Sequence, residues 1–83
     1  MKTTNLWLLQ RHQRATIAHL QSEPGLQQRL QALGFRTGRQ VVILRKAWFR
    51  GPVHVRVGMT EVMLRRREAM EIHVSTHEDS AQS

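Results

Sequence analysis

The sequence lacks cysteine and tyrosine, and only four of its 83 residues are aromatic. Without cysteine the chain can form no disulfide, no thiolate zinc site and no thiol nucleophile. A chain of this length forms one domain and buries only about 60% of the surface that it exposes when unfolded. These limits exclude an enzyme with a cleft between two domains. They predict a fold held together by its apolar core alone, or with the help of a partner chain.

Long hydrophobic runs are also missing. The longest spans a few residues, whereas a helix that crosses a bilayer needs about 18. The N-terminus shows neither the basic-then-apolar pattern nor the small-residue cleavage site of a signal peptide. The hydrophobic share of 40% and the charged share of 23% are typical of globular proteins. We therefore expect a folded cytoplasmic protein, which could still act at a membrane surface.

Acidic residues are few: six Asp and Glu stand against 13 Lys and Arg, which gives a formal net charge of +7. The excess lies in the middle of the chain, because residues 35–67 carry nine bases and a single acid, Glu61. Residues 68–83 carry four acids and no Lys or Arg. A basic middle of this kind predicts an anionic partner, which could be a nucleic acid, an anionic lipid surface or an acidic protein face.

The clearest helix signal covers residues 23–33. Ser22 is a typical N-cap residue, and Pro24 stands where its missing N–H has no cost. An apolar stripe at helical spacing is formed by Leu26, Leu30 and Leu33. Gly34 supplies the left-handed conformation that ends many helices, and Phe35 can fold back on the last turn. We expect the leucine stripe to belong to the core.

Most of the remaining chain shows strand patterns. Residues 52–57 alternate valines with polar residues, and residues 61–65 alternate again. Further elements expected are strands over 15–20, 40–47 and 72–74, and a short helical turn near 67–71. Together these predict a mainly β fold, a small barrel of five or six short strands with one main helix. We expect a single domain over residues 1–75 and a polar tail at 76–83 that frays.

One stretch, residues 30–38 (LQALGFRTG), looks like the signature R-L-x-x-L-G-[hydrophobic]-x-x-G, with Arg29 as the leading base. The strand, loop and strand at 41–55 and the closing pattern at 62–74 follow the same family, so the similarity covers about residues 6–74. On these residues the chain resembles FeoA-like proteins. The resemblance implies an SH3-like barrel with helical decoration, the domain type also found at the C-terminus of DtxR-type metal-dependent repressors. From the sequence we expect no DNA-binding helix-turn-helix before it.

The loop at 47–52 reads Ala-Trp-Phe-Arg-Gly-Pro, where the family pattern reads Ala-Pro-x-Gly-[Asp/Gly]-Pro. Two large aromatic residues in a basic loop between strands are unusual, and they are typical of anchors that fill a partner's pocket. The predicted partner-binding residues are Trp48, Phe49, Arg50, Gly51 and Pro52. The alternative interpretation is that Trp48 folds back over an open end of the barrel, where a small core needs its area.

The candidate basic surface consists of Arg36, Arg39, Arg45, Lys46, Arg65, Arg66 and Arg67. Such a set could hold the protein against anionic inner-leaflet lipids, at about 1 kcal/mol for each well-placed base. It could equally steer the protein onto an acidic face of a protein partner. The alternative is a solvated surface whose net charge keeps the domain in solution.

No catalytic or metal-binding pattern stands out. No two of the five histidines lie four residues apart within an expected helix, since His73 and His77 fall on the expected last strand and the polar tail. The only candidate cluster, His77 with two acids, also lies in that tail. Residues 34–38 lack the lysine of a phosphate-binding loop, and the serines lie in a cap and a tail rather than at a nucleophile elbow. We expect no enzyme activity, no resident metal and no cofactor.

The resemblance implies a non-catalytic accessory protein of bacterial ferrous-iron uptake, which binds and regulates the membrane GTPase-permease FeoB from the cytoplasmic side of the inner membrane. Two alternatives stay open. One is a small nucleic-acid-binding barrel, since such barrels combine basic grooves with stacking aromatics, although only four aromatics are present. The other is a detached regulatory domain of a metal-dependent repressor. A homo-oligomer is also compatible with exposed loop aromatics.

Overall fold

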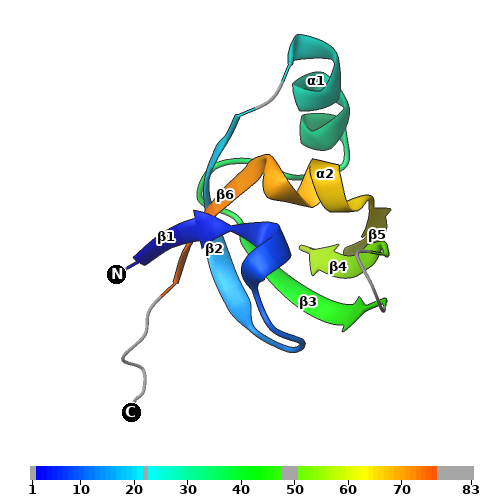
Figure 1. Cartoon of the computed structure of the whole chain (residues 1–83). Helices are drawn as coiled ribbons and strands as arrows, with labels where there is room; N and C mark the ends of the chain where they lie inside the picture. The colour runs from blue at the N-terminus through cyan, green and yellow to red at the C-terminus, as the bar shows by residue number, and fades with distance from the viewer. Residues whose placement is uncertain (1, 22, 48–50, 77–83) are drawn as a thin grey trace.

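The computed structural model describes residues 2–21, 23–47 and 51–76 (Figure 1). The elements follow in the order β1 (Lys2–Asn5), 3-10 helix η1 (Leu6–Leu8), β2 (Arg14–Leu20), α1 (Pro24–Ala32), β3 (Gln40–Lys46), β4 (Val53–Val57), β5 (Thr60–Leu64), α2 (Arg66–Met70) and β6 (Ile72–Thr76). All six strands form one antiparallel sheet in the order β1-β6-β2-β3-β4-β5. The prediction of a mainly β fold with one main helix and a second short helix is confirmed.

The sheet curls around a single core, and its strand alternation decides which side chains enter that core. In β4 the three valines, Val53, Val55 and Val57, are fully buried, while the intervening Arg56 is exposed. The two outer strands of the sheet, β1 and β5, do not pair with each other in the described part of the chain. The barrel is therefore open along one side, and α2 packs on η1 (Figure 1).

The first strand and the end of the last one were not predicted. Residues 2–5 form β1, which pairs with β6 so that Thr3 lies opposite Ser75 and Lys2 opposite Thr76. Thr76 is buried, so the prediction that the polar tail begins to fray at residue 76 is wrong for this residue. A short polar segment shows no strand pattern in the sequence. It becomes a strand because β6 provides the backbone hydrogen-bond partners. Residues 77–83 lie outside the described part of the chain.

The helix α1 ends as the sequence predicts. Gly34 adopts a positive φ of 107°, the Phe35 N–H donates to the Leu30 carbonyl at 3.0 Å, and the Gly34 N–H donates to the Gln31 carbonyl at 3.0 Å. These are the two hydrogen bonds of a Schellman motif. Phe35 and Leu30 are fully buried, whereas the other two stripe leucines are only partly buried. The predicted N-cap, Ser22, lies outside the described residues, and Glu23 stands at the cap position without a side-chain cap hydrogen bond.

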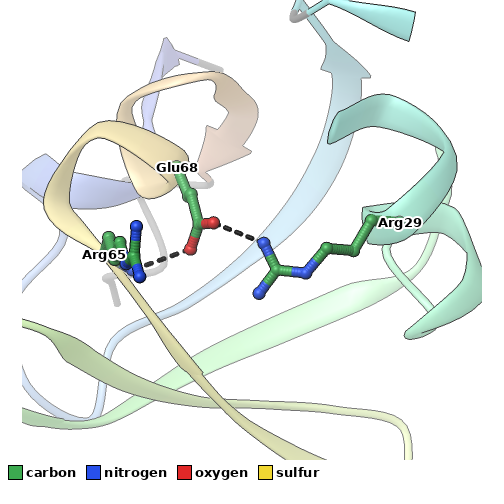
Figure 2. A network of polar contacts seen from close by, with 3 residues as sticks. All are labelled: Arg29, Arg65 and Glu68. Carbon is green, nitrogen blue, oxygen red and sulfur yellow. Dashed lines mark hydrogen bonds and ion pairs between the residues drawn. The ribbon is translucent and has the colours of Figure 1, made fainter. Parts of the chain in front are cut away.

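One buried carboxylate joins α1 to α2 (Figure 2). Glu68 accepts a hydrogen bond from the Arg65 backbone N–H at 2.9 Å and forms an ion pair with Arg29 of α1. Burial by itself would raise the pKa of Glu68, but the Arg65 N–H and the Arg29 guanidinium outweigh it and hold that pKa below its ordinary value. The carboxylate thus caps α2 at its N-terminus and fastens α1, which stands apart from the sheet in Figure 1.

Among the described residues, no helix is both long and apolar enough to cross a bilayer.

Candidate docking surface beside the β3–β4 connection

The two ends of the loop at 47–52 are held together, since the Ala47 N–H donates to the Pro52 carbonyl at 3.1 Å. Two hollows lie beside this junction. The larger, of about 460 Å³, is lined by Pro52, Met63, Leu64, Arg65 and Arg66. The smaller, of about 190 Å³, is lined by Arg45, Lys46, Ala47, Pro52, His54 and Met63. Pro52 and Met63 belong to both hollows, so they form the ridge between them.

The strand register explains this grouping. Arg45 of β3 lies opposite His54 of β4, and His54 lies opposite Met63 of β5. Side chains of directly opposed residues stand on the same face of a sheet, so these three form a row across the outer face. Met63 is 57% exposed on β5, an edge strand. The junction therefore presents apolar surface flanked by positive charge, which we call the loop-base surface: Arg45, Pro52, His54, Met63, Arg65 and Arg66.

The predicted partner-binding residues are only partly accounted for. Trp48, Phe49 and Arg50 lie outside the described residues, while Gly51 is half-buried and Pro52 is exposed. Met63, which the sequence analysis did not single out, is the large apolar side chain of the loop-base surface. Its signal was an apolar residue on the polar side of an alternating strand.

The seven predicted basic residues do not form one patch. Arg45, Lys46, Arg65 and Arg66 line the two hollows of the loop-base surface. Arg39 lines a different hollow. Arg67 lines one that it shares with Arg65 and with the acids Glu23, Glu68 and Glu71. Arg36 is exposed and lines none of these hollows.

Lys46 has a role within the fold. It lies opposite the buried Val53, so its side chain starts on the inner face of the sheet. Its ammonium donates to the carbonyls of Trp7 and Leu9 at 2.8 and 3.0 Å and lies 4.9 Å from the centre of the Trp7 ring. The guanidinium of Arg66 lies 5.8 Å from the same ring. Two cations on one indole, together with the two carbonyl contacts, fix η1 against β3 and α2.

Replacing Lys46 by Met should therefore destabilise the fold. The variant keeps much of the apolar stem but leaves two carbonyls without a charged donor, which we expect to cost about 1–3 kcal/mol. Urea unfolding followed by Trp fluorescence measures the change. Arg45→Met, at the exposed neighbouring position, is the matched control and should stay within about 0.5 kcal/mol of wild type. Equal stabilities for the two variants would contradict this role.

The histidines do not assemble a metal centre in the described part of the chain, where no group of three or more His, Asp or Glu side chains is placed to hold an ion. His54 Nε2 lies 3.1 Å from Glu61 Oε1. The rings of His19 and His73 stack with their centroids 4.5 Å apart and an interplanar angle of 8°. A bulge in β2 between Ile17 and His19 places these two histidines opposite each other, which alternation alone did not predict.

Comparison with known proteins assigns the chain to one family. A family model described as the FeoA domain matches residues 4–76. The chain is similar to a solved FeoA from Stenotrophomonas maltophilia in complex with zinc, at 30% identity over 94% of this chain and 92% of that one, with a TM-score of 0.77. That protein is described as an SH3 domain protein and a candidate activating factor of bacterial ferrous iron transport. A search of curated protein sequences gives no significant match.

Other solved structures share the fold. The FeoA protein from Chlorobium tepidum is 29% identical over 95% of this chain and 76% of that one, with a TM-score of 0.85. A manganese-dependent transcriptional repressor is 20% identical over 90% of this chain but only 42% of its own length, with a TM-score of 0.82. The SH3-like fold expected from the sequence is thereby confirmed, in separate FeoA proteins and as part of a longer repressor.

Proposed function

The chain belongs to the FeoA family, which is associated with ferrous iron transport, and from this premise we propose that it is a non-catalytic accessory protein that binds and regulates the permease FeoB on the cytoplasmic side of the membrane. The observation that carries the proposal is the loop-base surface. It combines an exposed apolar ridge, Pro52 and Met63, with flanking arginines. Such a combination suits a protein face with an apolar centre and an acidic rim.

Several features of the loop-base surface favour protein binding over catalysis. Its ionisable side chains are three arginines and one histidine, and the histidine already has Glu61 beside it. Arginine stays protonated at every physiological pH, so it supplies charge and hydrogen bonds but no proton transfer. The sequence also predicts three contact residues in the loop between Ala47 and Gly51, next to Pro52 of this surface: Trp48, Phe49 and Arg50. We place the contact with FeoB here, with nearby arginines steering the encounter.

The test is the affinity of the purified chain for detergent-solubilised FeoB. Met63→Ser should weaken binding about fivefold to tenfold, because it removes the apolar ridge, and should leave stability nearly unchanged, because Met63 is largely exposed. Met59→Ser is the matched control. Met59 is 99% exposed and lies in the turn before β5, away from the loop-base surface, so this variant should bind as wild type does.

Each alternative has a distinct result in the same experiment. If Met63→Ser and Met59→Ser lower the affinity for FeoB equally, the loop-base surface is not the interface. If the wild-type chain does not bind FeoB, the FeoB proposal itself is refuted. Submicromolar binding to a mixed oligonucleotide at physiological salt, with a steep salt dependence, would favour the nucleic-acid alternative. Self-association abolished by Met63→Ser would assign the surface to a second copy of the chain.

A further inference from the structure

A third hollow, of about 330 Å³, lies on the same outer face of the sheet as the loop-base surface. It is lined by Arg14, Arg39, Gln40, Val41, Val42, Arg56 and Gly58. Three of these side chains are arginines from three separate parts of the chain, and no acid lines the hollow. Of the three, only Arg39 belonged to the predicted basic surface.

The strand register accounts for the convergence. Arg14 of β2 lies opposite Val42 of β3, and Val42 lies opposite Arg56 of β4. The three side chains therefore stand in one row on the outer face, with the small apolar Val42 between two arginines. Adjacent strands are about 4.8 Å apart, so the two arginine backbones are roughly 10 Å apart. At that separation both guanidinium groups can reach one anion placed above Val42.

Arg39 closes a third side of the hollow. It precedes β3, and its guanidinium lies against Gly58 in the turn between β4 and β5. Gly58 has a positive φ of 62°, and a Cβ at that position would overlap Nη2 of Arg39. The glycine thus serves two needs at once, because it allows the turn and leaves room for the guanidinium.

The nearest acid does not neutralise the set. Glu61 lies opposite Arg56 across β4 and β5, but its carboxylate lies 3.1 Å from His54 Nε2, toward the loop-base surface. Within the described part of the chain, neither Arg14, Arg39 nor Arg56 has an ion pair with a carboxylate. Like charges gathered on one face repel one another, and a bound anion relieves that repulsion.

We propose that this hollow is a binding site for a soluble diphosphate group, with Arg14 and Arg56 on either side of it and Arg39 closing the end. The guanidinium forks match phosphate oxygens in a bidentate manner, and Gln40 adds an amide. The volume lies at the lower end of small-ligand pockets, which suits a compact anion better than a large organic ligand. The proposal does not depend on binding to FeoB and goes beyond it.

The test is isothermal titration of the full chain with inorganic pyrophosphate, with orthophosphate and sulfate at equal ionic strength as comparators. We expect saturable binding of one pyrophosphate per chain, at least tenfold tighter than either comparator. Amide shifts of Val42 and Gly58 in ¹⁵N-labelled protein should move along the same binding curve. Arg14→Gln/Arg56→Gln should weaken binding about tenfold or more, and Arg39→Gln should weaken it less, because its guanidinium is a single contact at the end.

Arg36→Gln/Arg67→Gln is the control for the double variant, since it removes the same two charges from exposed residues outside the hollow. The substituted arginines are exposed, so melting temperatures should stay close to that of wild type. Equal weakening by Arg36→Gln/Arg67→Gln, or equal binding of pyrophosphate and sulfate, would reduce the effect to net charge and overturn the proposal. Binding to phosphatidylglycerol vesicles without saturable pyrophosphate binding would assign the arginines to a lipid surface and would also overturn it.

Discussion

Phe35→Ala should remove about 3–5 kcal/mol from the free energy of unfolding and lower the melting temperature by roughly 15 °C or more. Among the residues that the structure describes, Phe35 is the largest fully buried side chain, at 0% exposure. The free energy of unfolding of a chain of this length is about 4–12 kcal/mol in total, so the variant loses a large part of its stability. Calorimetry and urea unfolding measure the two quantities.

The effect has a single physical source, the packing of the buried ring. The ring is fully buried in the hydrophobic core cluster of the described residues, and the Phe35 N–H makes a Schellman hydrogen bond that ends α1. Alanine keeps the N–H but leaves a cavity, so the loss should come from packing alone. Leu33→Ala, at a half-buried position in the same helix end, is the matched control and should cost about 1 kcal/mol. A loss for Phe35→Ala no larger than for Leu33→Ala would show that the core repacks around the gap.

The elements that could be predicted are those whose signal is local. Gly34 and Phe35 define the end of α1 because a helix end needs a left-handed residue and an apolar residue after it. The valines of β4 define a strand because alternation has a period of two wherever one face is buried. Both signals depend only on neighbours in the chain, and both were confirmed.

What could not be predicted depends on pairing between distant segments. The β1 strand is short and polar, and it becomes a strand because β6 lies beside it. A bulge in β3 between Ile43 and Arg45 shifts the alternation by one residue, so that Lys46 starts on the inner face beside Val53. Without the bulge, alternation from Ile43 would have placed Lys46 on the outer face of the sheet. A one-residue shift of this kind reverses which face a side chain occupies.

The same reasoning applies to the two candidate sites. Arg14 and Arg56 are 42 positions apart in the chain, and only the register of β2, β3 and β4 sets them on either side of Val42. Met63 joins Arg45 in the same way, through His54. Charge counts located the basic middle of the chain, but the grouping of its members follows from the sheet.

Glu68→Gln should lower the free energy of unfolding at neutral pH by about 1.5–3 kcal/mol, the range for hydrogen bonds to charged groups. The amide oxygen can still accept from the Arg65 N–H, so this variant isolates the charge, whereas Glu68→Ala also removes the cap and should cost more. Arg29→Gln should cost less than either, because Arg29 is half exposed and its loss leaves the Arg65 hydrogen bond in place. Urea unfolding of the three variants measures the order.

The pH dependence follows from the lowered pKa of Glu68 in the folded chain. The unfolded chain takes up this proton at a higher pH than the folded chain does, so the carboxylate contributes its full stability above the ordinary glutamate pKa of about 4.3 and loses it as the pH falls through the folded value. The stability difference between wild type and Glu68→Gln should therefore be constant near neutral pH and shrink in acid. A difference that persists unchanged at low pH would mean that shape, and not the charge of the carboxylate, holds α1 to α2.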